Sequence, residues 1–307
     1  MGLVRSTLIG CVLFFASAPL NVALAQAWLP MKGEGQVTIT YENLYVKDHF
    51  DYKGNRFDAG PIRTHTVVTT FEYGLTNKLT LDSELTHVTS KYEGFVGPVP
   101  HGPPDTGFYH PTFQDLRVGI RYNVLSKQFV VTPLVAVVIP THHYETRGHT
   151  AVGRDLRELQ IGVNVGRDLE DIIPRTYVQA RYTYAFVQDV QQFNLNRSNV
   201  DWEFGYFANS RLSLRFTGAW QQTYDGVRYP LDQNIPDFHE LHDRAAQSSF
   251  LRFGGGLSVS LNRSIDLHAD FGNTYRGRTT HGARGLSLGL SFRFSRGGFR
   301  VGKFQSR

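Results

Sequence analysis

The sequence has little cysteine, few long apolar runs and little net charge, and each absence excludes a class of protein. With one Cys in 307 residues, the chain cannot contain a disulfide framework. Beyond the N-terminal segment no apolar run reaches the roughly 20 residues that a transmembrane helix needs. A net charge of +5 is small for this length, so we expect no nucleic-acid partner. The 41% hydrophobic content excludes a disordered chain.

The segment from Met1 to Ala25 has the layout of a secretory signal peptide. Arg5 lies in a short polar start, an apolar stretch follows, and an Ala-Leu-Ala sequence precedes Gln26. Small residues at these two positions are typical of a cleavage site. We therefore expect residues 1–25 to be removed and residues 26–307 to form one exported domain. The single cysteine leaves with the signal peptide, which excludes thiol chemistry.

What the mature chain has in abundance is alternation of apolar and polar residues with a period of two. In residues 79–88, for example, Leu79, Leu81 and Leu85 alternate with polar residues, as expected for a β-strand. Twelve segments are predicted as strands in this way: 36–46, 62–73, 79–88, 114–123, 129–140, 157–166, 175–187, 199–206, 212–223, 250–260, 265–275 and 285–294.

The connections between these strands alternate between long and short. The long ones are 47–61, 89–113, 141–156, 188–198, 224–249 and 276–284. The short ones are 74–78, 124–128, 167–174, 207–211 and 261–264. Outer-membrane barrels have this pattern, with long extracellular loops and short periplasmic turns. The sequence therefore predicts an all-β protein, a transmembrane antiparallel β-barrel of about 12 strands in the cell outer membrane.

The polar face of these strands carries ionisable residues of both signs. In a membrane barrel this face lines the lumen, and the acids and bases there nearly balance, so they will pair. Twelve tilted strands give a backbone radius of roughly 12 Å, which such side chains narrow further. The predicted lumen-lining residues are Asp82, Glu84, Arg117, Arg121, Glu158, Arg181, Asp201, Glu203, Arg215, Arg252, Asp266, Asp270 and Arg293.

Aromatic residues lie at the ends of the predicted strands, in the apolar phase. This is where a membrane barrel carries its two interfacial girdles, although aromatics are also common in strands generally. The predicted girdle residues are Tyr45, Phe186, Trp220 and Tyr275 at the outer end, and Tyr73, Tyr122, Tyr206 and Phe294 at the periplasmic end.

The strand at 129–140 is apolar on both faces and contains Pro133, which cannot donate to a ladder. Its residues Leu134, Ala136 and Val138 could line an apolar section of the lumen, or an inward loop could cover the strand. The sequence also departs from the usual barrel ending, because residues 295–307 follow Phe294.

No residue pattern predicts an enzyme, a metal site or a cofactor. Barrel phospholipases have a His two residues before the nucleophilic Ser, and no His in this sequence has a Ser at that spacing. Clustered ligand types at 237–243, with His239 and His242, raise a metal site as a hypothesis, but solvated loop histidines explain them better. Loop arginines could contact lipopolysaccharide phosphates, namely Arg147, Arg154, Arg228, Arg276 and Arg278.

Five short segments carry a family resemblance, and Tyr73–Leu79 and Phe113–Arg117 are the more specific ones. The others are Lys32–Val37, Gly60–His65 and Leu156–Gln160. Together these segments resemble an outer-membrane transporter family labelled MetA-pathway of phenol degradation. The resemblance spans most of the mature chain. It implies an outer-membrane barrel that passes small, often aromatic or apolar, molecules, and it assigns no catalytic residue.

Two functions are therefore expected from the sequence. The first is a passive channel or transporter for small solutes, in contact with outer-membrane lipid and lipopolysaccharide. The alternative is a structural or surface-binding barrel whose outer loops contact a partner or lipopolysaccharide. The solute and the oligomeric state are left open by the sequence.

Overall fold

The computed structural model describes residues 27–95, 102–241 and 243–295. The predicted signal peptide, residues 1–25, lies outside the described residues, and so do residues 296–307 of the C-terminal tail. Among the described residues, no helix is long and apolar enough to cross a membrane.

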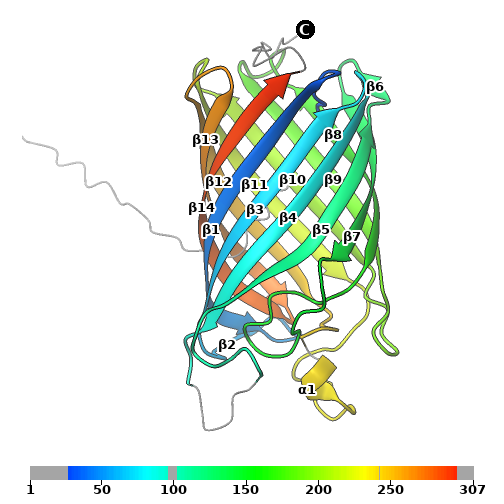
Figure 1. The fold of residues 1–307 in the computed structure, drawn as a ribbon, viewed down its shortest axis with the longest axis vertical. Helices are drawn as coiled ribbons and strands as arrows, with labels where there is room; N and C mark the ends of the chain where they lie inside the picture. The colour runs from blue at the N-terminus through cyan, green and yellow to red at the C-terminus, as the bar shows by residue number, and fades with distance from the viewer. Residues whose placement is uncertain (1–26, 96–101, 242, 296–307) are drawn as a thin grey trace, which may run out of the picture.

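Twelve long strands form one closed antiparallel barrel, which confirms the predicted fold class (Figure 1). Consecutive strands pair with each other, and β14 pairs with β1 to close the sheet. The strands are β1 (Glu34–Phe50), β3 (Ile62–Gly74), β4 (Leu79–Tyr92), β5 (His110–Tyr122), β7 (Val130–Pro140), β8 (Glu158–Asp168), β9 (Thr176–Val187), β10 (Arg197–Phe207), β11 (Leu212–Thr223), β12 (Ser249–Ser260), β13 (Ile265–Arg278) and β14 (Thr280–Ser295). The connections contain β2 (Arg56–Phe57), β6 (Leu125–Ser126) and the one-turn helix α1 (Phe238–Leu241).

The long connections gather at one end of the barrel, with β2 and α1, and the short turns lie at the other end (Figure 1). Five of the six predicted long connections are present, at 51–61, 93–109, 141–157, 188–196 and 224–248. We call this end extracellular and the opposite end periplasmic, as in outer-membrane barrels.

The sixth long connection, predicted at 276–284, is wrong. Strand β13 continues to Arg278 and β14 begins at Thr280, so Thr279 alone separates them, at a φ of 43°. The reason is backbone pairing, since Arg278 pairs with Ser249 on β12 while Thr280 pairs with Phe50 on β1. The ladders therefore continue past the point where side-chain alternation stops.

The two faces of the wall differ in polarity as the alternation predicts. On β14, Leu286 and Leu288 are 60% and 57% exposed, whereas Ser287 and Ser291 are 2% exposed. Successive strand residues point to opposite faces, so the exposed apolar row lies outside and the buried polar row inside. The inner face is the more polar face of the strands, with β7 as the exception.

Strand β7 accommodates Pro133 because its ladder to β5 stops at Leu134. Pro133 lacks a backbone N–H, but no β5 residue pairs with this position, so no hydrogen bond is lost there. The pairing of Pro133 with Val163 on β8 continues. On the same strand Leu134, Ala136 and Val138 are buried on the inner face.

The outward orientation of Ile39, near the middle of β1, predicts the cost of a charge there. We expect Ile39→Arg to lower the free energy of unfolding in lipid by about 2–4 kcal/mol, because the charge meets the bilayer midplane. The matched control Tyr275→Arg, at the extracellular end of β13, should lose at most about 1 kcal/mol. Urea titrations of protein folded in vesicles measure both, and equal losses would contradict this orientation.

Candidate functional site

The inner face of the barrel carries all thirteen ionisable residues that the sequence places in the lumen. Each has the same phase as the buried polar residues of its strand, and none lies among the exposed outward positions. They come from nine strands: β4 (Asp82, Glu84), β5 (Arg117, Arg121), β8 (Glu158), β9 (Arg181), β10 (Asp201, Glu203), β11 (Arg215), β12 (Arg252), β13 (Asp266, Asp270) and β14 (Arg293).

One group of paired charges lies on β3, β4 and β5. The guanidinium of Arg121, 1% exposed, contacts Glu72 and also Asp82, with 3.2 Å between Nε and Oδ1. Arg117 contacts the same Asp82 and donates to Gln160 Oε1 at 3.2 Å. Two cations therefore share two carboxylates on this side of the lumen, and the arrangement fixes all four side chains.

A second pair links β11 to β13 across the intervening β12. Arg215 donates to both carboxylate oxygens of Asp270, at 2.7 and 2.5 Å, and both side chains are 8% exposed. Gly256 on β12 lies between them, and a Cβ atom there would collide with the Asp270 carboxylate. The glycine thus makes room for a fork-like ion pair, the strongest kind that these side chains form.

Further inward acids are also bound. Glu158 pairs with Arg197 at 2.6 Å and Asp266 pairs with Arg293 at 2.9 Å. Because cations and carboxylates neutralise each other along the lumen, the inner face presents a polar but nearly balanced lining rather than a field of one sign.

Sequence reasoning missed two inward acids, Glu42 on β1 and Glu72 on β3. Glu42 is 1% exposed and Glu72 contacts Arg121. A signal was present, since Glu42 continues the polar phase of Gln36, Thr38 and Thr40 in the first strand. The sequence predicts this strand, and its polar phase places Glu42 on the inner face.

The periplasmic end of the lumen holds the residues that precede β1. The amide of Ala27 donates to Gln179 Oε1 on β9 at 3.2 Å, and its carbonyl accepts from Thr132 Oγ1 on β7 at 2.8 Å. The Trp28 ring meets Tyr177 edge-on at 5.8 Å between centroids. Since Gln179 and Thr132 are buried inner-face residues, this segment lies inside the barrel wall.

The extracellular end is closed by loops that a buried carboxylate ties together. Asp105, 1% exposed, accepts from the His149 amide at 2.8 Å, His149 Nδ1 at 3.1 Å, the Thr150 amide at 3.0 Å and Thr150 Oγ1 at 2.9 Å. Burial by itself would raise the pKa of Asp105, but these hydrogen bonds outweigh it and hold the pKa below its ordinary value. Asp105 therefore joins the loop 93–109 to the loop 141–157 as a carboxylate.

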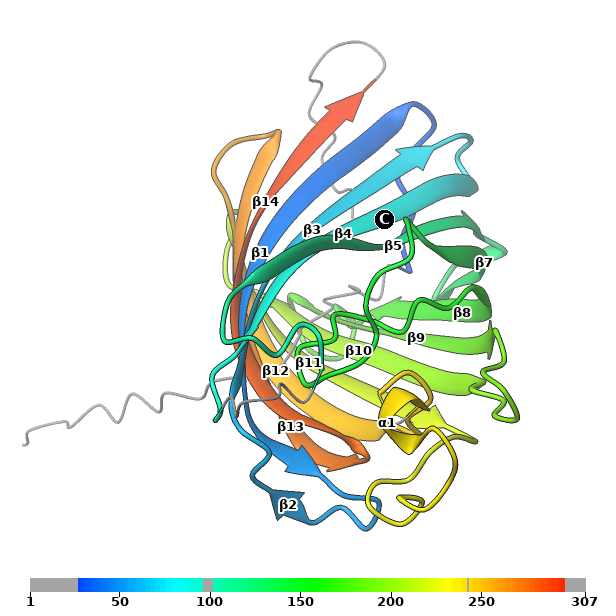
Figure 2. The same cartoon turned by 60° about the horizontal axis from the view of Figure 1, so that its bottom comes forward.

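The loop 141–157 also binds the loop 224–248, and Figure 2 shows the connection after β7 crossing the mouth. The Gly148 amide donates to Asp243 Oδ2 at 2.9 Å, and Arg154 donates to Ser248 Oγ at 2.9 Å. Arg244 donates to the Arg154 carbonyl at 3.1 Å. Apolar residues of both loops, namely Leu156, Val227, Phe238 and Leu241, form one buried cluster with Val187 at the end of β9 and Leu195 of the connection 188–196.

Three histidines that fall in the predicted long connections 47–61, 89–113 and 276–284 lie in strands, because the extracellular ends of the strands are longer than predicted. His49, His110 and His281 lie in β1, β5 and β14. The rings of His49 and His281 pack at 4.7 Å between centroids, and His149 lies 6.0 Å from His49. Among the described residues no group of three metal-ligand side chains is arranged to hold an ion. The hypothesis on His242 falls outside these residues, and the His239 side chain is not described.

The eight aromatic residues proposed for the girdles all point outward, in the exposed phase of their strands. At the periplasmic end Phe294 stacks with Phe71 at 6.2 Å and with Tyr73 at 6.3 Å between centroids. At the extracellular end Phe186 and Tyr275 are 47% and 56% exposed. Contact of these rings with a membrane interface stays a prediction.

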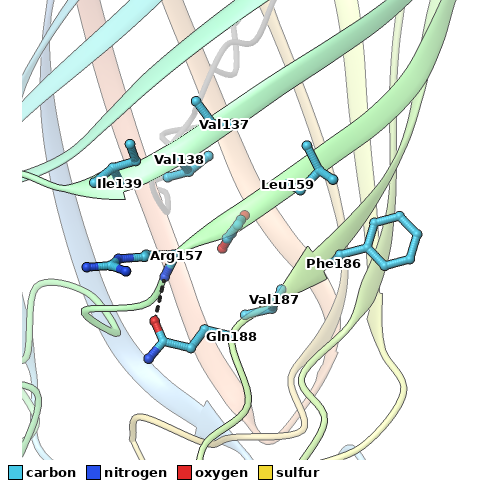
Figure 3. A pocket seen from close by; sticks show the side chains of 9 residues that line it. Val137, Val138, Ile139, Arg157, Leu159, Phe186, Val187 and Gln188 are labelled. Carbon is cyan, nitrogen blue, oxygen red and sulfur yellow. Dashed lines mark hydrogen bonds between the residues drawn. The ribbon is translucent and has the colours of Figure 1, made fainter.

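A shallow hollow of about 520 Å³ lies at the extracellular ends of β7, β8 and β9 (Figure 3). Its apolar lining comes mainly from the outward residues Val137, Ile139, Leu159 and Phe186. The Arg157 amide donates to Gln188 Oε1 at 3.3 Å along its rim. Because these side chains continue the outer wall, the hollow is separate from the charged lumen.

The buried pair of Arg215 and Asp270 predicts an unequal response to neutralisation. We expect Asp270→Asn to lower the free energy of unfolding by about 3 kcal/mol, because it leaves a buried guanidinium without its counter-charge. The control Asp266→Asn removes a more exposed pair and should cost at most about 1 kcal/mol. Urea unfolding in vesicles compares the two, and a smaller loss for Asp270→Asn would show that water solvates this pair.

The four hydrogen bonds to Asp105 predict how the loops respond to pH. Its pKa is lowered in the folded state, so the carboxylate stabilises the closed loops fully above the ordinary Asp pKa of about 3.9 and loses this effect as the pH falls through the folded value. We expect slow amide exchange at His149 and Thr150 from neutral pH to about pH 4, and fast exchange in Asp105→Asn throughout. Hydrogen exchange measures this, and a pH midpoint above 5 would contradict it.

Comparisons with known proteins agree with the fold. No family model and no curated protein sequence matches the chain. Among solved structures, an outer membrane channel from Pseudomonas putida F1 is similar at a TM-score of 0.67 and 12% identity, over 88% of this chain and 98% of that one. The translocator domain of the autotransporter NalP from Neisseria meningitidis gives a TM-score of 0.49 at 12% identity, over 86% and 90%. At 12% identity the similarity to the first of these structures shows the barrel fold alone, and the MetA-pathway label stays a hypothesis.

Proposed function

We propose that this protein is a passive channel of the outer membrane for small solutes. The observation that carries the proposal is the inner face, which is lined mostly by polar and charged side chains, while the outer face is mostly apolar. A barrel with a purely structural role could fill its interior with apolar side chains, as many small barrels do. Polar groups along the full length are what a solvated passage needs.

The passage is narrow because side chains and segments occupy it at three levels. Ala27 and Trp28 lie at the periplasmic end, the ion pairs of Arg121 and Arg215 lie on the wall, and the Asp105 loops cover the extracellular mouth. A backbone radius of roughly 12 Å leaves little free space after these groups are added. The arrangement favours small molecules over a wide sieve.

The solute class that we propose is small molecules, aromatic or apolar ones included. The buried Leu134, Ala136 and Val138 give the inner face of β7 an apolar strip beside the paired charges. Such a strip can contact an apolar solute while balanced charges beside it do not select for an ion of one sign.

We propose no enzymatic role, because on the outer wall, where barrel phospholipases carry their His and Ser, no described His hydrogen-bonds to a Ser. The outward His65 hydrogen-bonds to Tyr41 at 2.7 Å and to Tyr109 at 3.0 Å, so its partners are phenols rather than a serine nucleophile. We therefore include the absence of catalysis in the proposal, and a lipid-hydrolysis assay of the reconstituted protein checks it.

Reconstitution tests the transport proposal directly. We expect vesicles that contain the full mature chain to swell in small sugars and small aromatic acids, and planar bilayers to show small conductance steps. Deleting the extracellular loop residues 230–243 should leave or increase this flux. If no solute and no ion crosses the membrane, the channel proposal is wrong. Loss of binding to whole surface polysaccharide after the deletion would favour the alternative of a surface-binding barrel.

The position of Trp28 predicts a specific effect on flux. Trp28→Ala removes the ring that contacts Tyr177, so the segment loses a contact inside the lumen and the passage widens. We expect several-fold faster swelling than in the unaltered protein. Tyr206→Ala, which removes an outward ring at the same end of the barrel, serves as the control and should not change the rate. A Trp28→Ala protein with unaltered flux would show that this segment does not limit passage.

A further inference from the structure

A row of cations crosses the outer wall near the extracellular end. Arg284 on β14 pairs in register with Tyr45 on β1, Tyr45 with Arg63 on β3, and Arg63 with Lys91 on β4. Their inward neighbours Val46, Ile62, Tyr92 and Ala283 form a buried cluster on the inner face. Because strand residues alternate, the four members of the row point outward.

The row carries a surplus of positive charge. Glu93 is the acid that contacts it within the described part of the chain, at 3.3 Å from Arg63 Nε and 2.9 Å from Lys91 Nζ. Arg63 and Arg284 both lie over the Tyr45 ring, at 5.1 and 5.7 Å from its centroid. The Tyr45 ring keeps the two arginines on the wall. Because the row has three cations and Glu93 carries one negative charge, two positive charges remain uncompensated.

Directly below this row the outer wall is polar where a lipid-facing wall is ordinarily apolar. The next outward positions are Asn43 on β1, His65 on β3 and Thr89 on β4, which pair with each other in register. His65 links the hydroxyls of Tyr41 and Tyr109, and these phenols are 42% and 40% exposed. Polar groups that face hydrocarbon are costly, so this patch indicates a polar group outside the wall.

The height of the row matches the outer membrane interface. Gly35 on β1 pairs with Tyr73 and Phe294, two of the periplasmic aromatic residues. A rise of about 3.3 Å per residue and a tilt of about 40° place Tyr45 about 25 Å above Gly35 along the barrel axis. The apolar band of such barrels is about 25 Å tall. Arg63, Arg284 and Lys91 therefore lie where headgroups of the outer leaflet begin.

The rest of the outer rim differs from this sector. The extracellular ends of β9 and β11 present Phe186 and Trp220 outward, while Ser198 on β10 is 2% exposed and hydrogen-bonds to the hydroxyls of Tyr182 and Tyr224. Among the loop arginines suggested by the sequence, Arg147 pairs with Glu145 and Arg228 with Asp232, while Arg154 binds the neighbouring loop. Arg276 and Arg278 are exposed on β13, next to the cationic row.

We propose that the sector formed by Arg284, Arg63 and Lys91, with the polar patch of Tyr41, His65 and Tyr109 below, is a binding site for a phosphorylated glycolipid of the outer leaflet. The cations bind a headgroup phosphate, for which charge-assisted hydrogen bonds from guanidinium and ammonium groups are well suited. The phenols and the imidazole bind sugar hydroxyls or amides, and acyl chains continue down the apolar wall along Leu286 and Leu288. The inference rests on the proposed outer-membrane location but not on transport.

Binding of defined lipids to the full mature chain tests the proposal. Native mass spectrometry of the protein in detergent, with bisphosphorylated lipid A as the probe, measures the affinity. The triple variant Arg63→Gln, Lys91→Gln and Arg284→Gln should bind at least about tenfold more weakly, since each lost phosphate contact is a charge-assisted hydrogen bond. The matched control changes one lysine and two arginines of the periplasmic turns, Lys78→Gln, Arg211→Gln and Arg263→Gln, and should keep its affinity.

Three further arms fix the chemistry of the ligand. Lipid A without phosphates should bind as weakly to the unaltered protein as lipid A binds to the triple variant. Inorganic phosphate at millimolar concentration should not displace lipid A, whereas displacement would mean that the site binds free phosphate. Phosphatidylglycerol should bind more weakly than lipid A, and the double variant Tyr41→Phe and Tyr109→Phe should remove this preference.

The outcomes separate this proposal from the proposed channel. Equal affinity of the triple variant and the unaltered protein, or an equal loss in the control, would overturn the site. Heat-modifiable migration on gels verifies that each variant folds, and vesicle swelling is measured on the same preparations. A triple variant that conducts solute but does not retain lipid A supports the site, whereas a lack of flux in every preparation would overturn the channel alone.

Discussion

The hydrogen bonds between β1 and β14 are the constraint on which the rest of the molecule depends. They remove the two free edges that a twelve-strand sheet would otherwise have, so that each strand is paired on both sides. Closure also separates the two faces of the sheet completely. Once the wall is closed, every odd or even position of a strand has a fixed environment, which is why charge on one face and leucine on the other can coexist in one short sequence.

Much of the fold was accessible from the sequence, because alternation is a local signal. It identified the twelve strands, and the phase of residues such as Asp82 and Arg215 followed from it. The extracellular ends were not accessible, since residues such as Gly282 and His281 lie in a ladder that backbone pairing maintains without an apolar pattern. The Asp105 loop contacts and the position of Trp28 join segments distant in the chain, and no local pattern records such contacts.

The charges of the inner face and those of the outer cationic row are compensated to different degrees. Inside, Arg121 and Arg215 meet carboxylates closely, and the pairs rigidify the wall while they leave the lumen nearly neutral. Outside, Glu93 compensates part of the charge of Arg63 and Lys91, so a surplus remains at the rim. The same residue types thus serve structure on one face and remain available for an anion on the other.

The segment before β1, which carries Trp28, is tied to the periplasmic rim by two hydrogen bonds. The Gly33 amide donates to the Gly74 carbonyl at 2.8 Å and the Lys32 amide to Asn77 Oδ1 at 3.0 Å, so the chain is fastened to the periplasmic rim just after Trp28. A group on such a short tether returns to its place as an intramolecular ligand, at an effective concentration of about millimolar or more. In the proposed channel, a solute that displaces Trp28 would therefore compete with an occupant that never diffuses away, and closure afterwards would be independent of how many barrels the membrane contains.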